Sequence, residues 1–137
     1  MNIDQNKELL RRFSAEILNQ GNMVVADQII APDYLNHNPV PGQAPGLEGF
    51  KRSITSMRMA FPDLNETIEA IIAEGDLVSV RATHRGTHEG TYMGVPGTNR
   101  SVIIPTMYFV RVVNGKITDL WLNWDILGML QQIGAFD

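Results

Sequence analysis

The dipeptide Asn114-Gly115 constrains the fold of this chain more than any other short segment. It lies between two long runs rich in β-branched and aromatic residues, 102–113 and 116–124. Asn-Gly is the strongest short hairpin signal, because both residues tolerate the positive φ angles of a tight turn that matches strand twist. The sequence therefore predicts a long antiparallel hairpin near the end of the chain.

Two more strands are predicted before this hairpin. Residues 64–73 and 77–87 are strand-like, and Glu74-Gly75-Asp76 forms a turn between them. The segment 94–99, with Pro96 and two glycines, is predicted to be a loop. From residue 64 to residue 124 the pattern indicates a meander of long antiparallel strands.

The first part of the chain is predicted to be mostly helical. Leu10, Phe13 and Ile17 recur on one stripe and predict a helix over 4–20, with Asp4 as its N-cap. A second helix is expected to begin at Asn22 and to end at Ala31-Pro32.

Three further segments complete the expected secondary structure. After a short extended piece, 34–38, the three prolines and two glycines of 39–46 exclude regular structure. A third helix is predicted over about 47–60, and a short last helix from Asp125 to about Gly134.

Helices followed by a strand meander indicate an α+β fold rather than a parallel βαβ fold. We expect one domain, 1–137, in which three to four helices close a strongly curved antiparallel sheet into a cone-shaped barrel. A cone of this kind encloses one pocket, which we expect to be apolar.

Composition excludes several classes of function. The net charge of −4 argues against nucleic acid as a partner, because phosphate binding needs a basic face. With no cysteine, the chain has no disulfide, thiolate chemistry or zinc–sulfur site. No apolar stretch is long enough to span a membrane, and the polar N-terminus has no signal core, so we expect a cytoplasmic protein.

About ten segments, in order, resemble one known family. They are Arg12-Phe13, 18–22, 30–34, His37 before the Pro-Gly loop, 46–50, 60–64, 74–78, 86–90, 114–117 and 124–134. In this order they are similar to the SnoaL-like polyketide cyclases of the nuclear-transport-factor-like superfamily. The resemblance implies the same curved sheet, often a homodimer, and ring closure of a polyketide ester by intramolecular aldol condensation, with an acid–base carboxylate and neither metal nor organic cofactor.

The chain departs from that family at one important position. The resemblance implies an aspartate on the last strand, three residues before the aspartate that opens the final helix. This chain keeps the second acid, Asp125, followed by Gly128, but has Leu122 at the first position. Thr106 and Tyr108 also stand where some cyclases have longer polar or imidazole groups.

Three residues remain as candidates for acid–base catalysis: His84, His88 and Asp125. His84 has the strand parity of Val78, Val80 and Ala82, so it is expected to point inward, as a base or as a satisfied core histidine. His88 could be an imidazole at the pocket mouth or could hold the strand end through a loop contact. For Asp125 we favour an N-cap over a chemical role.

Further residues are candidates for the pocket wall. His37 could line the entrance beneath the Pro-rich loop, or could be solvated. Strand alternation places Leu120, Leu122 and Trp124 on one face of the last strand, and Thr106 and Tyr108 on one face of its partner. Besides His37, the candidates are Tyr34, Phe61, Tyr92, Met93, Thr106, Tyr108, Leu120, Leu122 and Trp124.

The three histidines do not have the spacing of a metal site. His84 and His88 are about 13 Å apart on an extended strand, and no acid completes a triad with them. We therefore expect no metal. Met107, Phe109 and Trp121 fall on the opposite strand face, which suggests a homodimer interface.

Three functions stay open at this point. The first is a cofactor-free cyclase or isomerase acting on an apolar carbonyl compound. The second is a non-catalytic dimeric carrier of a hydrophobic small molecule, which Leu122 favours. The third is a protein–protein module that uses the outer sheet face.

Overall fold

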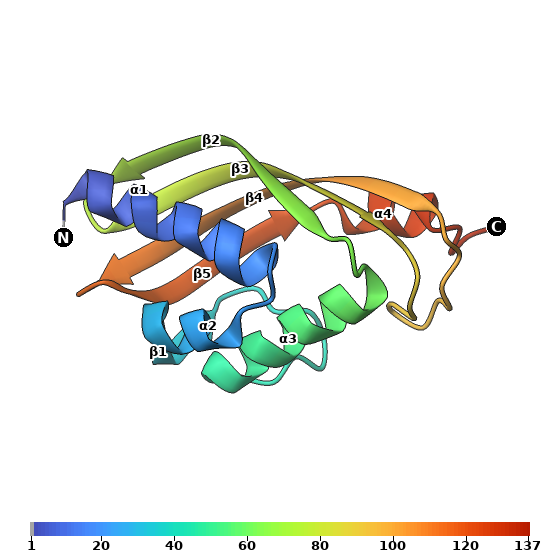
Figure 1. Ribbon diagram of the computed structural model, residues 1–137, viewed down its shortest axis with the longest axis horizontal. Helices are drawn as coiled ribbons and strands as arrows, with labels where there is room; N and C mark the ends of the chain where they lie inside the picture. The colour runs from blue at the N-terminus through green and yellow to red at the C-terminus, as the bar shows by residue number, and fades with distance from the viewer. Residues whose placement is uncertain (1) are drawn as a thin grey trace.

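The computed structural model describes residues 2–137, and in it one curved sheet is covered on one face by helices (Figure 1). The chain runs α1 (Ile3–Arg12), η1 (Phe13–Leu18), α2 (Met23–Ile29), β1 (Ile30–Asn36), α3 (Gly46–Ala60), β2 (Asn65–Glu74), β3 (Leu77–Thr87), β4 (Ser101–Val113), β5 (Lys116–Trp124) and α4 (Ile126–Gln132). The predicted α+β class and the curved sheet are confirmed.

The sheet has the order β1-β5-β4-β3-β2. Strands β2 to β5 form the expected antiparallel meander, and Asn114, with φ of 51°, begins the tight turn between β4 and β5. The meander pattern did not predict that β1 pairs in parallel with β5. This pairing begins at Ile30, so α2 ends at Ile29, before the predicted Ala31-Pro32 boundary.

The first helix begins with a capping box. The side chain of Asn2 accepts from the backbone N–H of Gln5, and the Gln5 side chain accepts from the backbone N–H of Asn2. The prediction of Asp4 as the N-cap was wrong, because Asn2 is the N-cap and Asp4 lies in the first turn of the helix. The predicted stripe is confirmed, since Leu10, Phe13 and Ile17 are buried. The last part, η1, is π-helical.

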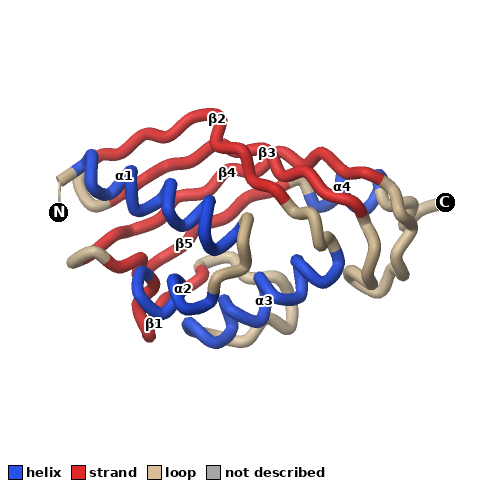
Figure 2. The backbone as a smooth tube through the Cα atoms, viewed as in Figure 1, coloured by secondary structure: helices blue, strands red, loops and turns tan. Residues whose placement is uncertain are grey.

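Two apolar clusters hold the helices on the sheet. The larger one joins α1, η1 and α2 to the middle strands and includes Ile17, Ile30 and Val80. The smaller one joins the end of α3 to β4 and α4 and includes Phe61 and Met129. As Figure 2 shows, α3 lies beside α2, while α4 lies at the far end of the molecule, near the C-terminus. The space between α3 and the sheet is therefore bounded by both clusters.

No helix within residues 2–137 is long and apolar enough to cross a membrane.

Candidate active site

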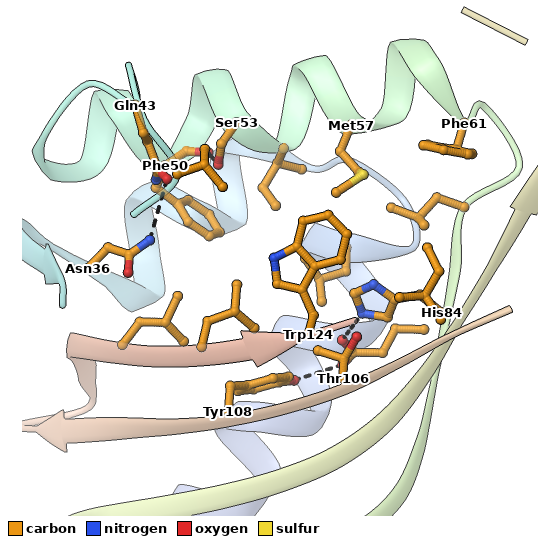
Figure 3. A pocket seen from close by; sticks show the side chains of 18 of the residues that line it. Asn36, Gln43, Phe50, Ser53, Met57, Phe61, His84, Thr106, Tyr108 and Trp124 are labelled. Carbon is orange, nitrogen blue, oxygen red and sulfur yellow. Dashed lines mark hydrogen bonds and ion pairs between the residues drawn. The ribbon is translucent and has the colours of Figure 1, made fainter. Parts of the chain in front are cut away.

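A cavity of about 140 Å³ lies between α3 and the concave face of the sheet. Figure 3 shows Phe50, Met57 and Phe61 facing it from α3 and its end, opposite Tyr108, Thr106 and Trp124 on the sheet side. Eight of the predicted wall residues line it: Tyr34, Phe61, Tyr92, Thr106, Tyr108, Leu120, Leu122 and Trp124. The lining is mainly aromatic and aliphatic, as expected for a site that binds an apolar molecule.

Strand pairing explains why the sheet residues meet there. Thr106 is opposite Trp124, and Tyr108 is opposite Leu122, in the β4–β5 ladder. Successive residues of a strand point to opposite faces, so these four share the concave face with His84 of β3. His84 therefore points inward, as predicted, and lies in the pocket wall.

The structure adds a residue that the sequence analysis did not name, Glu66 of β2. Its side chain is only 1% exposed, and Oε2 lies 2.7 Å from His84 Nε2. Its other oxygen, Oε1, accepts a 2.7 Å hydrogen bond from the hydroxyl of Tyr108. Glu66 also lines the cavity. The pocket thus contains a buried carboxylate, although Leu122 occupies the position that the family resemblance assigned to an acid.

The backbone around Glu66 is fixed from a distant part of the chain. The side chain of Asn19, the residue that follows η1, accepts a hydrogen bond from the Glu66 N–H at 2.6 Å and donates one to the Glu66 carbonyl at 3.1 Å. The oxygen and the nitrogen of the Asn19 amide therefore both hold the backbone of Glu66, which restricts where its carboxylate can point. Asn19 is a positioning residue for this site.

Tyr108 is a hydrogen-bond donor at this site over a wide pH range. Burial raises its pKa well above the usual value, and the charge of Glu66 and the hydrogen bond to it raise the pKa further. The phenol stays protonated and donates to Glu66 Oε1. Burial also raises the pKa of Tyr34, and it raises that of Tyr92 to about 12.

His84 has one ring nitrogen occupied and one available. Nε2 pairs with Glu66, and within residues 2–137 Nδ1 makes no hydrogen bond. When Nε2 donates its proton to the carboxylate, Nδ1 presents a lone pair. A carboxylate that orients a histidine in this way is the arrangement that general bases use in many enzymes.

One more polar atom at the sheet end of the cavity lacks a partner. Thr106 is 2% exposed, and its Oγ1 makes no hydrogen bond to any atom of residues 2–137. Buried hydroxyls are nearly always hydrogen-bonded, so this one has free capacity toward the cavity that Thr106 lines. It can donate to an oxygen of a bound molecule.

Four predicted site residues lie outside the cavity lining. His88 is fully buried, its Nδ1 lies 3.0 Å from Thr98 Oγ1, and its ring centroid is 5.4 Å from that of Phe61. It holds the loop after β3, so the prediction of a pocket-mouth imidazole was wrong. Asp125 caps α4 by accepting from the Gly128 N–H at 2.8 Å, as we favoured.

The other two residues are at the surface. His37 follows β1 and stacks on Trp121, with ring centroids 4.3 Å apart and planes 5° from parallel. It does not line the entrance, because the stack holds it on the outer side of the sheet. Met93 is 44% exposed with φ of 48°, and it does not line the cavity.

Comparison with known proteins identifies the family of this chain. The family model of the SnoaL-like polyketide cyclases matches residues 8–133. The chain belongs to the SnoaL-like polyketide cyclase family. It is 31% identical to aklanonic acid methyl ester cyclase DauD of Streptomyces sp. (strain C5), over 93% of this chain and 80% of that protein. It is 32% identical to nogalonic acid methyl ester cyclase of Streptomyces nogalater, over 85% of this chain and 88% of that protein.

Solved structures share the fold of this chain. The structure of TsrD from Streptomyces laurentii has a TM-score of 0.90 and 25% identity, and it covers 99% of both chains. A SnoaL-like polyketide cyclase from Agrobacterium tumefaciens, 18% identical, has the same fold with a TM-score of 0.79, over 94% of this chain and 98% of that one. In this chain the acid of the pocket, Glu66, comes from β2.

Proposed function

We propose that this protein is a cofactor-free cyclase that closes a ring by intramolecular aldol condensation of an apolar carbonyl compound. The observation that carries the proposal is the buried Glu66, which contacts both His84 and Tyr108 in the wall of an apolar cavity. The family membership and the cyclases among its relatives support the reaction class.

In this proposal His84 moves the proton. Nδ1 takes a proton from the carbon next to a carbonyl, while Nε2–H stays bonded to Glu66. The resulting enolate carbon attacks a second carbonyl of the same molecule, which forms the new carbon–carbon bond and leaves an alkoxide. The alkoxide takes the proton back from Nδ1, so that His84 returns to its first state.

Two neighbours would support the charge that develops. The Thr106 hydroxyl is available to donate to the enolate oxygen. Tyr108 keeps Glu66 in place and disperses its charge while the imidazolium exists. A water-poor cavity strengthens both effects, because the local dielectric constant is low.

The test is turnover of a panel of polyketide methyl esters and steroid-type enones by the wild type and by two histidine variants. His84→Gln removes the base and is expected to lower kcat about 10²–10⁴-fold. His37→Gln, outside the cavity, is the matched control and should leave kcat within about twofold. Equal rates in His84→Gln and the wild type would refute the mechanism.

A carrier function is the second candidate, because Leu122 lines the cavity where the family resemblance implied an acid. A carrier would be stabilised thermally by members of the same panel without converting them. Stabilisation without turnover in the wild type would therefore favour the carrier over the cyclase.

We also propose that two copies pair through the outer face of the sheet. Ile103, Met107 and Phe109 of β4 are 57%, 56% and 51% exposed on that face. Clustered exposed apolar side chains of this size mark interaction surfaces. Sedimentation should give a dimer mass for the wild type and a monomer mass for Phe109→Glu; a wild-type monomer would contradict the pairing.

A further inference from the structure

The interior cavity shares one wall with a second hollow. This outer hollow, of about 420 Å³, lies between β1 and the loop 39–46. Tyr34, Asn36 and Gln43 line both spaces. Three side chains thus separate the site that contains Glu66 and His84 from a surface recess on the side of β1.

Tyr34 has an unused hydroxyl in that shared wall. The residue is 4% exposed, its ring packs edge-on against Phe50 with centroids 5.6 Å apart, and its hydroxyl has no partner within residues 2–137. Buried hydroxyls are nearly always hydrogen-bonded, so this one has a donor to offer. Because burial raises the pKa of the phenol, Tyr34 remains a donor and can be satisfied by an acceptor on a ligand.

The other two side chains of the wall are only weakly paired. Asn36 Nδ2 lies 3.5 Å from Gln43 Oε1, at the limit of a hydrogen bond, and Figure 3 shows this contact at the end of the cavity away from His84. Asn36 Oδ1 is used by the backbone N–H of Asn38. The amide of Gln43, on the loop, can therefore be separated from Asn36 at small cost and bind a ligand instead.

The charges around the wall restrict what the ligand can carry there. Among residues 2–137, no lysine or arginine lines either space, and Asp33 is the charged residue that lines the outer hollow. A carboxylate or phosphate group would lose its hydration without gaining a cation, and it would face Asp33. Neutral hydroxyl and carbonyl groups match two amides and one phenol.

We propose that the wall formed by Tyr34, Asn36 and Gln43 is a second binding subsite, which takes a neutral hydroxyl- or carbonyl-bearing extension of the ligand. The apolar carbonyl part occupies the inner cavity, and the extension passes between Asn36 and Gln43 into the outer hollow. The assignment of the inner part rests on the proposed function. The ligand class is thus an elongated molecule with reactive carbonyls at one end and an uncharged polar group at the other.

The test compares the affinity of three probes by isothermal titration calorimetry. The probes are 2-acetylnaphthalene, its 6-(2-hydroxyethoxy) derivative and its 6-(carboxymethoxy) derivative. The wild type should bind the hydroxyethoxy probe about tenfold more tightly than the parent, as one added hydrogen bond of about 1.4 kcal/mol implies. The carboxymethoxy probe should bind more weakly than the parent.

Variants assign the gain to the wall. Tyr34→Phe, which removes only an unbonded hydroxyl and should fold normally, is expected to abolish the tenfold gain, and Gln43→Ala to reduce it. His84→Gln should keep the gain, because it alters the other end of the cavity. The proposal is overturned if the wild type shows no gain, if Tyr34→Phe retains it, or if no probe binds.

These results are independent of turnover. A hydroxyl-dependent gain in a protein that converts nothing would leave the subsite in place and remove the cyclase proposal. Turnover without the gain in affinity would leave the cyclase proposal in place and remove the subsite.

Discussion

This protein contains two histidine–carboxylate pairs of nearly equal length in very different surroundings. His84 and Glu66 meet at 2.7 Å in the pocket wall, with side chains 16% and 1% exposed. His37 and Asp119 meet at 2.9 Å on the outer side of the sheet, with side chains 32% and 19% exposed. The pairs contain the same chemical groups, so the difference between them isolates the effect of the environment.

In the surface pair, His37 and Asp119 are both held by neighbouring side chains. Asp119 accepts from Thr118 Oγ1 at 2.6 Å and lies 3.8 Å from Arg111 Nη1, while Trp121 covers the His37 ring. Arg111 itself lies over the Trp121 ring, 5.4 Å from its centroid. No hollow among those described borders His37. The buried pair instead faces a cavity, and we infer that access to a ligand, rather than the pair itself, distinguishes a catalytic pair from a structural one.

The largest expected effect is on catalysis. Glu66→Gln keeps the shape but removes the charge that orients His84, and should lower kcat about 10²-fold or more. The double variant Glu66→Gln/His84→Gln should be little slower than His84→Gln alone, because the two act as a unit. Asp119→Asn should leave kcat within about twofold. Additive losses in the double variant would contradict a coupled pair.

The next effect is on stability. Tyr108→Phe leaves a buried Glu66 oxygen without its donor and should lower the free energy of unfolding by about 1–3 kcal/mol. Thr118→Val removes the matching hydroxyl at the surface pair, where water can replace it, and should cost less than about 1 kcal/mol. Urea denaturation at pH 7 measures the loss of stability in both variants. Equal losses would mean that burial does not make the His84–Glu66 pair more dependent on its neighbouring hydroxyl than the His37–Asp119 pair.

The smallest effect concerns pH. Burial alone would raise the pKa of Asp119, but the hydrogen bonds from Thr118 and His37, together with the charges of Arg111 and His37, outweigh it and lower the pKa. A lowered folded-state pKa stabilises the fold above the unfolded value of about 3.9, and this contribution is lost as the pH falls through the folded value.

The variant Asp119→Asn lacks this contribution at every pH. It should therefore be less stable than the wild type at pH 7, by up to about 1 kcal/mol for a surface pair, and the difference should shrink toward pH 3. Denaturation curves at several pH values test this expectation. A difference that stays constant from pH 7 to pH 3 would show that the Asp119 charge is not the cause.

The sequence predicted the second half of the fold better than the first. Turn residues at Asn114-Gly115 and Glu74-Gly75-Asp76 delimit β2 to β5 closely, and alternation assigned Thr106, Tyr108, Leu122 and Trp124 to the pocket. The parallel pairing of β1 with β5 joins residues more than eighty positions apart, and no local pattern specifies it.

Glu66 escaped prediction for a specific reason. It has the parity of Leu64 and Ile68, which alone would place it inward. Counting back from the pair Glu74–Leu77, however, a regular ladder would put Thr67 opposite His84. The register shifts by one residue between Ile68 and Ala70, and this shift brings Glu66 to His84. A bulge of this kind has no clear signature in a single sequence.

His37 and His88 were harder to place. A histidine before a proline-rich loop is compatible with either side of the sheet, and the stack on Trp121 depends on the β1–β5 pairing. For His88, the contact with Thr98 depends on the path of the loop between β3 and β4, because the two residues are ten positions apart. Both cases depend on tertiary contacts that strand alternation does not encode.

The extra residue in β2 also makes the site sensitive to strand register. Glu69 is unpaired in the ladder, and this bulge keeps Glu66 opposite His84. If Glu69 were drawn into a regular ladder, the residues before it would slip by one position, and the hydroxyl of Thr67 would stand opposite His84 in place of the carboxylate. The presence or absence of one bulge therefore separates a chain with a buried carboxylate beside its histidine from one whose pocket can only bind a ligand.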